Sequence, residues 1–325
     1  MDLDGQKVLV IGGAGFIGSH VVDELLATRV REVVIYDNFT RGVRDNLKGA
    51  LLDSRCTIYP NGGDIRDLDL LDDAMRGVDC VIHLAAMWLM HCQDYPRTAF
   101  EVNVGGTFNV LEASVRHSVR RLVFSSSASV YGDAVQLPMG ESHPLNNRNF
   151  YGATKISGEA MCKAFYESHG LPYVGLRYMN VYGPRQDQYS AYTGVIPKLL
   201  NAIDQNLHPE INGDGSQSYD FVYVKDVAKA NILALQSNEI DAFYNIGTGV
   251  QTSISNLVQE TLRLTSSRLK PVYIPYSDKD ARQFVRKRVG AVDLAKNKLG
   301  FSAETSLLDG LMKLMSWREA VGMTR

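Results

Sequence analysis

The sequence has almost no excess of charge and no long apolar run. Its 325 residues carry 34 Lys and Arg against 36 Asp and Glu, a formal net charge of −2 at pH 7. Because nucleic-acid-binding proteins display a strongly basic surface, we expect no nucleic-acid partner. No stretch combines the length and apolarity of a membrane span, so we expect no membrane partner either.

Cysteine is also scarce. The four cysteines, Cys56, Cys80, Cys92 and Cys162, lack the spacing of a disulfide framework or of a metal site. The first residues are acidic and lead directly into an apolar segment, so no secretory signal peptide is expected. Together these features predict a cytoplasmic protein with no bound metal.

The composition that remains is that of an ordinary globular protein. Hydrophobic residues make up 45% and charged residues 22% of the chain, which is typical of a folded protein and excludes a disordered one. At roughly 150 residues per domain, the length predicts about two domains.

Short apolar segments alternate with helical patterns through the first half of the chain. These segments are rich in β-branched residues and almost wholly apolar, as strands buried on both faces of a parallel sheet are. We expect strands at Lys7–Ile11, Glu32–Tyr36, Cys80–Leu84 and Arg121–Ser125, and helices at Phe16–Thr28, Phe100–Arg116 and Tyr151–His169. This order predicts an α/β fold with a doubly wound parallel sheet of the Rossmann type.

The regular alternation ends near Arg177. Loops rich in Gly, Pro, Asn and Asp then interrupt shorter elements, at Tyr182–Gly194, Asn212–Ser218 and Gly247–Thr252. We therefore expect a first domain at residues 1–177. Residues 178–325 are expected to form a smaller mixed α/β domain over the carboxyl ends of the strands, where such sheets bind ligands. The chain could also cross back to the first domain.

A glycine-rich turn follows the first expected strand. Gly12, Gly15 and Gly18 form a G-x-x-G-x-x-G pattern that opens a helix. Glycine lets the backbone approach a pyrophosphate, which the N–H groups of the helix N-terminus bind. Asp37 follows at the end of the second strand, where a carboxylate binds the adenosine ribose and favours NAD over NADP. A plain strand-to-helix turn is the alternative interpretation.

Three further residues bear on this candidate dinucleotide site. Asp64 and Ile65, which precede the expected strand at Cys80–Leu84, could hold the adenine, although Asp64 could instead be a helix-capping aspartate. Arg41 could accept a 2′-phosphate, but a contact with pyrophosphate or solvent is the favoured interpretation.

A serine-rich strand end and the helix after it carry the candidate chemistry. Ser125–Ser129 follows the fourth strand, and Tyr151 and Lys155 lie at i and i+4 of a helix, so both side chains point the same way. A lysine ammonium lowers the pKa of a neighbouring tyrosine from its usual value of about 10. The tyrosine then becomes a general base for an alcohol, which a serine hydroxyl can align. An incidental helical pair is the alternative.

Together with further motifs, these residues carry a resemblance to a known family. The motifs are Asp37-Asn38, His83-Leu84-Ala85-Ala86, Asn103 before Gly105-Gly106, and Asn180-Val181-Tyr182-Gly183-Pro184. In this order they resemble the extended short-chain dehydrogenase/reductase family over nearly the whole chain. Within it, the chain is most similar to nucleotide-sugar epimerases of the UDP-glucose 4-epimerase type.

The resemblance implies bound NAD and a nucleotide-diphosphate sugar, of which a UDP-sugar is the first choice. It implies that Tyr151 takes the proton of the sugar 4-hydroxyl, Lys155 lowers the tyrosine's pKa and holds the nicotinamide ribose, and Ser127 aligns the oxygen. C4 then inverts through a 4-keto intermediate. The implied NAD contacts are Gly12, Gly15, Phe16, Ile17, Gly18, Asp37, Asn38, Asp64, Ile65, Leu84, Ala85, Ala86, Asn103, Ser125, Tyr151, Lys155 and Tyr178.

Sister activities of the family remain open alternatives. Its dehydratases carry Thr-Asp-Glu where this chain has Ser127-Ala128-Ser129, and its UDP-glucuronate decarboxylases place a glutamate at the position of Ser129. The absence of these acids favours a 4-epimerase. A decarboxylase, dehydratase or oxidoreductase on the same kind of sugar is the second interpretation, and a non-catalytic dinucleotide sensor is the third.

The implied substrate contacts depart from the family pattern at two places. Tyr219 stands where an arginine usually grips the diphosphate, and a basic residue within Arg282–Arg288 could compensate. Trp88 could stack on the sugar or the nicotinamide, or pack as an apolar side chain. The implied substrate set is Trp88, Ser127, Asn180, Val195, Lys198, Tyr219 and Arg282.

The resemblance also bears on oligomeric state. The helices expected at Phe100–Arg116 and Tyr151–His169 are similar to those that form a four-helix interface in relatives. A homodimer is therefore implied.

Overall fold

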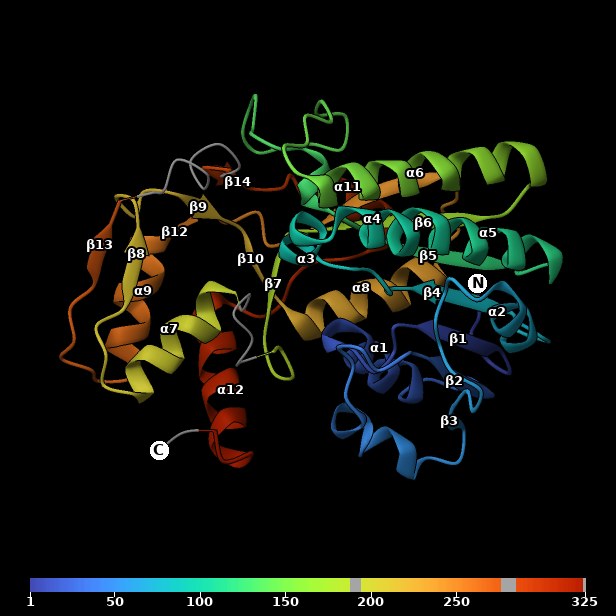
Figure 1. The fold of residues 1–325 in the computed structure, drawn as a ribbon, viewed down its shortest axis with the longest axis horizontal. Coiled ribbons are helices and arrows are strands. Elements are labelled where there is room, and N and C mark those ends of the chain that lie inside the picture. The colour runs from blue at the N-terminus through green and yellow to red at the C-terminus, as the bar shows by residue number, and fades with distance from the viewer. Residues whose placement is uncertain (188–193, 276–284, 324–325) are drawn as a thin grey trace.

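The computed structural model describes residues 1–187, 194–275 and 285–323. Its central feature is a seven-stranded sheet in the order β11-β6-β5-β4-β1-β2-β3, in which every neighbouring pair is parallel (Figure 1). The strands are β1 (Lys7–Ile11), β2 (Glu32–Tyr36), β3 (Cys56–Ile58), β4 (Cys80–His83), β5 (Arg121–Ser127), β6 (Tyr173–Tyr178) and β11 (Ala242–Ile246). The predicted doubly wound parallel sheet is confirmed.

Helices cover both faces of this sheet (Figure 1). One face carries α1 (Phe16–Leu26), α8 (Val224–Gln236) and α11 (Asp293–Leu299). The other carries α2 (Leu68–Ala74), α5 (Thr107–Arg116) and α6 (Phe150–His169), with α3 (Leu89–Asp94) and α4 (Pro96–Ala99) against α6. Because β11 and α8 come from beyond residue 178, this part of the molecule is built from two separate parts of the chain.

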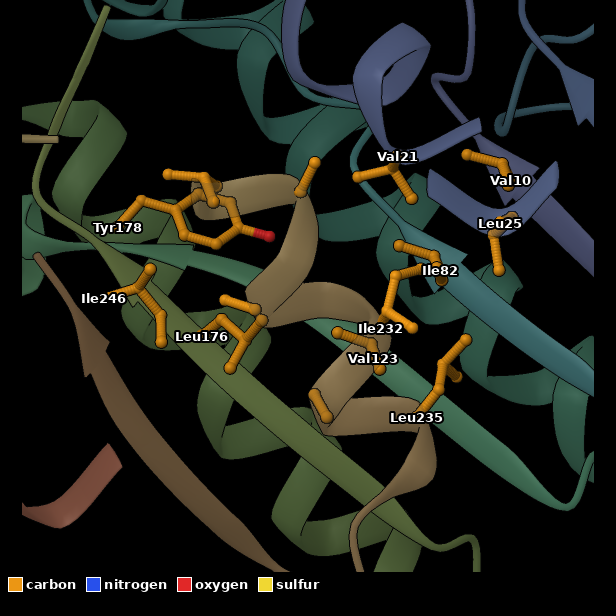
Figure 2. Packing of buried hydrophobic residues seen from close by; sticks show 14 of the residues in the cluster. Val10, Val21, Leu25, Ile82, Val123, Leu176, Tyr178, Ile232, Leu235 and Ile246 are labelled. Atoms are coloured by element: carbon orange, nitrogen blue, oxygen red, sulfur yellow. The ribbon is translucent and has the colours of Figure 1, made fainter. Parts of the chain in front are cut away.

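The strands send alternate residues into two hydrophobic cores. In β1, Val8 and Val10 pack into one cluster and Leu9 and Ile11 into the other, and all four are fully buried. Figure 2 shows the first cluster, which lies between the sheet and helices α1 and α8. The apolar character of each strand therefore follows from burial on both faces.

Most element boundaries lie within two residues of the predicted ones. Helix α6 ends at His169, where Gly170 adopts φ +69 and terminates the helix. Helix α1 ends at Leu26 rather than Thr28, β4 ends one residue early, and β5 continues to Ser127. The extension of β5 brings Ser127 itself into the sheet.

The helix predicted at Phe100–Arg116 is not uniform. Residues Phe100–Gly106 form a π-helix (η3), and only Thr107–Arg116 are α-helical. Extended π-helical segments are rare and occur mostly at functional sites. This one carries Asn103, which has a role described below.

Within the described residues, the second part of the molecule contains small sheets and three helices, which pack around a third core (Figure 1). Its strands are β7 (Asn180–Tyr182) with β10 (Phe221–Tyr223), β9 (Ser218–Tyr219) between β12 (Thr252–Ser253) and β14 (Lys287–Arg288), and β8 (Glu210–Asn212) with β13 (Val272–Ile274). The helices are α7 (Val195–Asp204), α9 (Ile254–Leu264) and α12 (Leu307–Ala320). Short turns complete the chain: η1 (Arg44–Leu47), η2 (Ala50–Leu52) and η4 (Ala128–Val130).

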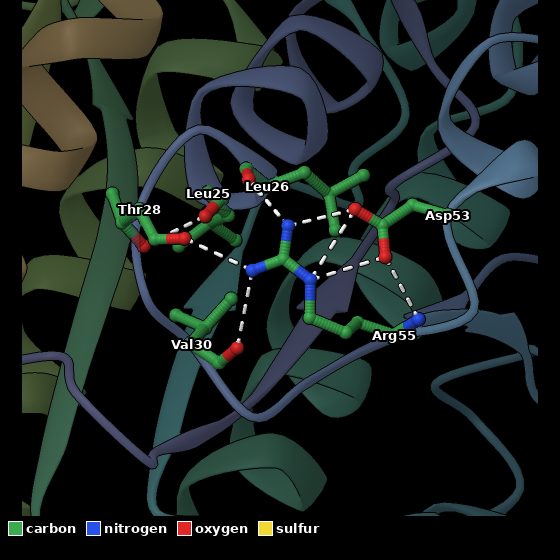
Figure 3. A network of polar contacts seen from close by, with 6 residues as sticks. All are labelled: Leu25, Leu26, Thr28, Val30, Asp53 and Arg55. Carbon is green, nitrogen blue, oxygen red and sulfur yellow. Dashed lines mark hydrogen bonds and ion pairs between the residues drawn. The ribbon is translucent and has the colours of Figure 1, made fainter.

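Arg55 satisfies the carbonyl end of α1 (Figure 3). Its Nη2 donates to the Leu26 carbonyl (2.6 Å), its Nη1 to the Thr28 carbonyl (2.9 Å), and its Nε to Asp53 (3.0 Å). A cation at a helix C-terminus is favourable because the last carbonyls lack intrahelical partners. This contact fixes the far end of the helix whose N-terminus lies at the glycine turn.

Within the three described ranges, no helix has both the length and the apolarity needed to cross a membrane.

Candidate functional site

The glycine turn between β1 and α1 is shaped by close backbone contacts. A Cβ on Gly12, which has φ +83, would lie 2.7 Å from the backbone N of Ala85, and one on Gly18 would lie 2.1 Å from the Gly12 carbonyl oxygen. A Cβ on Gly15 would meet only the Gly12 oxygen, at 3.2 Å. Gly15 is also the N-cap of α1 and provides no side-chain cap. The turn therefore leaves the first N–H groups of the helix open to an anion.

Asp37, at the end of β2, holds this turn. Its Oδ2 accepts from the Ala14 backbone N–H (2.9 Å) and its Oδ1 from that of Phe39 (2.8 Å). Burial raises the pKa of Asp37 although both hydrogen bonds act in the opposite direction. Its carboxylate lies beside the turn, and Asn38 in turn hydrogen-bonds Asp64.

Asp64 and Ile65 lie across the same end of the sheet. Arg66 pairs with Asp64 (Nη2 to Oδ2, 2.6 Å), and the hydrogen bond from Arg66 lowers the pKa of Asp64. The cap of α2 is Asp67, which accepts from the Leu70 N–H at 3.1 Å, so Asp64 is not the capping residue. Ile65 is 3% exposed, and its side chain packs against Gly106 so closely that a Cβ on this glycine would lie 2.5 Å from it.

The Leu84–Ala86 turn follows β4 beside the glycine turn. The N–H groups of Leu84 and Ala85 both donate to the Ile11 carbonyl, at 2.8 and 3.1 Å. Asn103 supports the next residues: its amide accepts from the Met87 N–H (2.7 Å) and donates to the Met87 carbonyl (2.9 Å) and to Thr154 Oγ1 (3.1 Å). Asn103 therefore connects η3, the turn after β4 and α6.

Ser127, Tyr151 and Lys155 meet at the carboxyl end of the sheet. Tyr151 lies in the first turn of α6, which Asn149 caps by accepting from the Gly152 N–H (2.8 Å). Ser127, at the end of β5, forms a side-chain hydrogen bond with Tyr151. The Nζ of Lys155 donates to the Ser125 carbonyl (2.6 Å) and lies 5.7 Å from the Tyr151 ring centroid.

Burial controls the ionisation of these groups. It raises the pKa of Tyr151 to about 12, against the opposing effects of the Ser127 hydrogen bond and the Arg288 charge. It lowers the pKa of Lys155 to about 8. The expectation that Lys155 brings the pKa of Tyr151 below 10 is therefore not met by the protein groups alone, because removing the phenolate from water has the larger effect.

Beneath these residues lies a buried ion pair that the sequence analysis did not identify. Glu159, one turn after Lys155 in α6, pairs with Arg177 of β6 (Oε2 to Nη2, 2.7 Å), and both side chains are 6% exposed. Arg177 also donates to the Tyr131 hydroxyl (2.9 Å), and Ser126 donates to Glu159. The position of Glu159 on the same face of the helix as Tyr151 and Lys155 is the signal that would have found it.

Tyr178, predicted among the cofactor contacts, lies in the core between β6 and α8 (Figure 2). It is 5% exposed, and its hydroxyl donates to Asn231 Oδ1 (2.9 Å) and hydrogen-bonds Ser125. The Tyr178 side chain therefore packs in the core and supports the end of β5 at Ser125.

Trp88 precedes α3 at its N-cap position and is half-buried. The guanidinium of Arg41 lies 4.7 Å from the centroid of the Trp88 ring and also pairs with Asp187 (3.3 Å). Arg41 thus connects the loop after β2 with the turn after β4 and with the segment after β7. In this cation–π contact, the Arg41 guanidinium covers one face of the Trp88 ring.

The remaining predicted substrate residues lie in the second part of the molecule. Asn180 begins β7 and is half-buried, Val195 begins α7, and Lys198 is exposed one turn later. The hydroxyl of Tyr219 donates to the Val285 carbonyl (2.9 Å). Arg282 lies outside the described residues.

A family model matches most of the chain, and single relatives match nearly all of it. The NAD dependent epimerase/dehydratase family matches residues 8–247. A putative UDP-glucose 4-epimerase of Methanocaldococcus jannaschii is 38% identical over 314 residues, which are 95% of this chain and 97% of the relative.

Two solved structures are similar to this chain in three dimensions over nearly its whole length. The UDP-N-acetylglucosamine 4-epimerase of Methanobrevibacter ruminantium, in complex with UDP-N-acetylmuramic acid, has a TM-score of 0.90 at 33% identity and covers 99% of this chain and 100% of its own. The UDP-glucose 4-epimerase of Thermotoga maritima, with UDP-glucose, has a TM-score of 0.89 at 33% identity, with 97% and 99% covered.

Proposed function

The chain belongs to the NAD-dependent epimerase/dehydratase family, and from this premise we propose that it binds NAD and inverts C4 of a nucleotide-diphosphate sugar. The observation that carries the proposal is the meeting of Ser127, Tyr151 and Lys155 at the carboxyl end of the sheet, beside the glycine turn. The two solved relatives described above were determined with UDP-sugars. Their ligands support a UDP-sugar as the substrate of this chain.

The residues around the glycine turn fit a dinucleotide. The open N-terminus of α1 at Gly15 accepts a pyrophosphate, and the Asp37 carboxylate lies where it can bind ribose hydroxyls. The buried ammonium of Lys155 needs polar partners beyond the Ser125 carbonyl, and the nicotinamide ribose hydroxyls provide them. We infer that Asn103 acts through Met87 by shaping this pocket.

Each of the three central side chains has a distinct role in the proposed reaction. Tyr151 removes the proton of the sugar 4-hydroxyl and returns it after C4 has inverted through a 4-keto sugar. Ser127, which hydrogen-bonds Tyr151, also hydrogen-bonds the same sugar oxygen and aligns it. When bound, NAD supplies a hydride acceptor and the positive charge of its oxidised nicotinamide ring. Lys155 adds a second positive charge, so the phenolate form of Tyr151 becomes accessible despite its burial.

Epimerisation is favoured over elimination by the turn after β5. Ala128 and Ser129 are 1% and 6% exposed and offer no carboxylate beside Ser127. A dehydratase or decarboxylase would need an acid from another segment. The turn thus supports net isomerisation.

We further propose a homodimer, with residues 1–177 as the cofactor domain and 178–325 as the substrate domain, from which α8 and β11 return to the sheet. The dimer would form through η3 with α5 and through α6, the helices of residues 100–116 and 150–169. Two large apolar side chains on this side, Phe100 and Phe108, are 51% and 46% exposed. Exposed phenylalanines are common in subunit interfaces because their burial stabilises association.

The proposal is tested by incubating the purified protein, without added NAD, with UDP-glucose, UDP-N-acetylglucosamine and UDP-glucuronate and following epimers by NMR. We expect one or more C4 epimers to form, and Tyr151→Phe to lower kcat about 100- to 10,000-fold because it removes the general base. Tyr166→Phe, on the same helix, is the matched control and should retain activity.

Other results would contradict the proposal in identifiable ways. Release of carbon dioxide or a 4-keto-6-deoxy product would indicate the decarboxylase or dehydratase instead. Bound NAD with no turnover of any sugar would indicate a sensor. Full activity of Tyr151→Phe would eliminate this tyrosine as the base.

A further inference from the structure

The loop after β2 lies against the glycine turn. The Val43 N–H and the Asn46 side chain both donate to the Ala14 carbonyl, at 3.2 and 2.9 Å. A Cβ on Gly42 would lie 2.8 Å from the Ala14 Cβ. Arg41, the residue before Gly42, is therefore placed at the edge of the turn that we propose for the pyrophosphate. The Arg41 side chain is exposed, so it can move without moving this backbone.

The Arg41 side chain reaches from this loop to the other side of the glycine turn. β1 lies between β2 and β4 in the sheet, so the segments that follow β2 and β4 flank the turn after β1. The Arg41 guanidinium lies 4.7 Å from the centroid of the Trp88 ring. Trp88 comes two residues after the Leu84–Ala86 turn, where the Ala85 N would lie 2.7 Å from a Cβ on Gly12. The contact of Arg41 with Trp88 thus joins the two flanks of the glycine turn.

A third segment, from the second part of the molecule, joins the same contact. Asp187 follows β7, and its Oδ2 accepts a hydrogen bond from Arg41 Nη2 at 3.3 Å. The chain just before Asp187 is attached to α1, where Arg185 pairs with Asp23 (2.7 Å). Asp187 is therefore held beside the cofactor side of the molecule, where Arg41 can reach it.

We propose that Arg41, Trp88 and Asp187 form a clasp that closes over NAD and controls its exchange. The clasp joins three segments around the glycine turn, so it encloses a dinucleotide whose pyrophosphate lies on the N-terminus of α1. Because NAD must pass the clasp in both directions, the clasp slows binding and release together and has little effect on affinity. The inference rests on the proposed function, which places NAD at this turn.

The contacts of the clasp are weak enough to open without unfolding. A cation over an indole ring and an exposed ion pair each contribute little in water. The side chains of Arg41 and Asp187 are 37% and 40% exposed, so water can replace both contacts when Arg41 turns outward. Arg44 offers a matched comparison, because its guanidinium lies 5.0 Å from the centroid of the Phe39 ring. Phe39 precedes Arg44 in the same loop, so this cation–π contact joins no second segment.

The test measures NAD exchange in the wild type, Arg41→Met, Asp187→Asn and the control Arg44→Met. Release of radiolabelled NAD from the loaded protein into excess unlabelled NAD gives koff, and equilibrium dialysis gives Kd. We expect koff to rise at least about fivefold in Arg41→Met, which loses both contacts, and about two- to fivefold in Asp187→Asn, which loses the ion pair. In both variants Kd should change by less than about twofold. Arg44→Met should match the wild type in koff and Kd.

Two results would overturn the inference and leave the proposed function intact. An unchanged koff in Arg41→Met or in Asp187→Asn would show that the clasp does not control release. A rise of Kd in proportion to koff would show that Arg41 binds the dinucleotide directly. A wild type that binds no NAD would instead overturn the proposed function, and this inference with it. All three substituted side chains are exposed, so the variants should fold.

Discussion

Tyr151 and Lys155 lie in a pocket from which water is largely excluded, and the two groups respond in opposite directions. Lys155 is 5% exposed, and burial lowers its pKa to about 8, whereas burial raises the pKa of Tyr151 to about 12. In both cases burial disfavours the charged form. The protein residues thus prepare a site in which further positive charge, supplied by a bound ligand, has a large effect on the tyrosine.

Lys155→Met should change how stability depends on pH. The folded pKa of Lys155, about 8, is below its unfolded value of 10.5, so between these values the unfolded chain binds more protons. The stability of the wild type should therefore rise relative to the variant as pH increases from 7 to 10, by about 2 kcal/mol. Urea unfolding of the NAD-free protein at both pH values measures this difference.

The exposed Lys163, on the same helix, provides the control for that experiment. Lys163→Met should show the same pH dependence as the wild type, since an exposed ammonium is already solvated. A Lys155→Met variant whose stability follows the wild type at both pH values would contradict the burial effect.

At the level of elements, two connections position the site. The β1–α1 turn depends on backbone contacts that only glycine permits at Gly12 and Gly18. Helix α6 is attached to β6 by the buried pair of Glu159 and Arg177. The first connection forms the proposed pyrophosphate site, and the second holds Tyr151 and Lys155 above the sheet.

Alanine substitutions at Gly18 and at Gly15 should affect different properties, the first the stability of the fold and the second the binding of NAD. Gly18→Ala should destabilise the protein by about 3 kcal/mol or more, because its Cβ would lie 2.1 Å from the Gly12 oxygen. Gly15→Ala should change stability by less than about 1 kcal/mol and still weaken NAD binding, since its Cβ enters the space at the helix N-terminus. Urea unfolding and NAD titration measure the two effects. If Gly18→Ala and Gly15→Ala destabilised the protein equally, these separate roles of the two glycines would be refuted.

Removing one partner of the buried ion pair should cost more than removing both. Glu159→Ala leaves the Arg177 charge unpaired and is expected to destabilise the protein by about 3–5 kcal/mol. The double variant Glu159→Leu, Arg177→Met replaces both charges by apolar side chains and should lose less. Denaturant unfolding of the three proteins tests this, and a double variant that loses at least as much as Glu159→Ala would contradict it.

At the level of the whole molecule, the sheet depends on the second half of the chain. Ile232 and Leu235 of α8 and Ile246 of β11 lie in the same core cluster as Val10 and Val123 (Figure 2). The cofactor side therefore cannot complete its core until residues beyond 178 have returned to it. This arrangement couples the two parts of the molecule during folding.

The proposed homodimer is tested by introducing a charge on the exposed face of α5. Phe108→Glu should convert a dimer into a monomer at micromolar concentration, since a carboxylate buried at an interface lacks a partner. Leu52→Glu, at a position that is 88% exposed in η2, is the control and should remain dimeric. Light scattering after size-exclusion chromatography measures the mass, and a monomeric wild type would refute the dimer.

Much of the fold and the position of the family motifs could be predicted from local patterns. The apolar strands and the helix end at Gly170 followed from periodicity and backbone conformation, which depend on neighbouring residues. The π-helix at Phe100–Gly106 was not predicted, because the same apolar spacing is compatible with an ordinary helix. The core position of Tyr178 was also missed, since it depends on α8, about fifty residues later.

The sequence by itself determined the alternation of strands and helices, the glycine turn and the shared face of Tyr151 and Lys155. Each of these features depends on residues only a few positions apart. Contacts between distant segments decided the rest. The return of β11 to the sheet, the pairing of Glu159 with Arg177 and the pairing of β14 with β9 each join segments that the sequence separates. The tertiary structure also decided the pKa of Tyr151, because burial is a property of the assembled core and not of the neighbouring residues in the sequence.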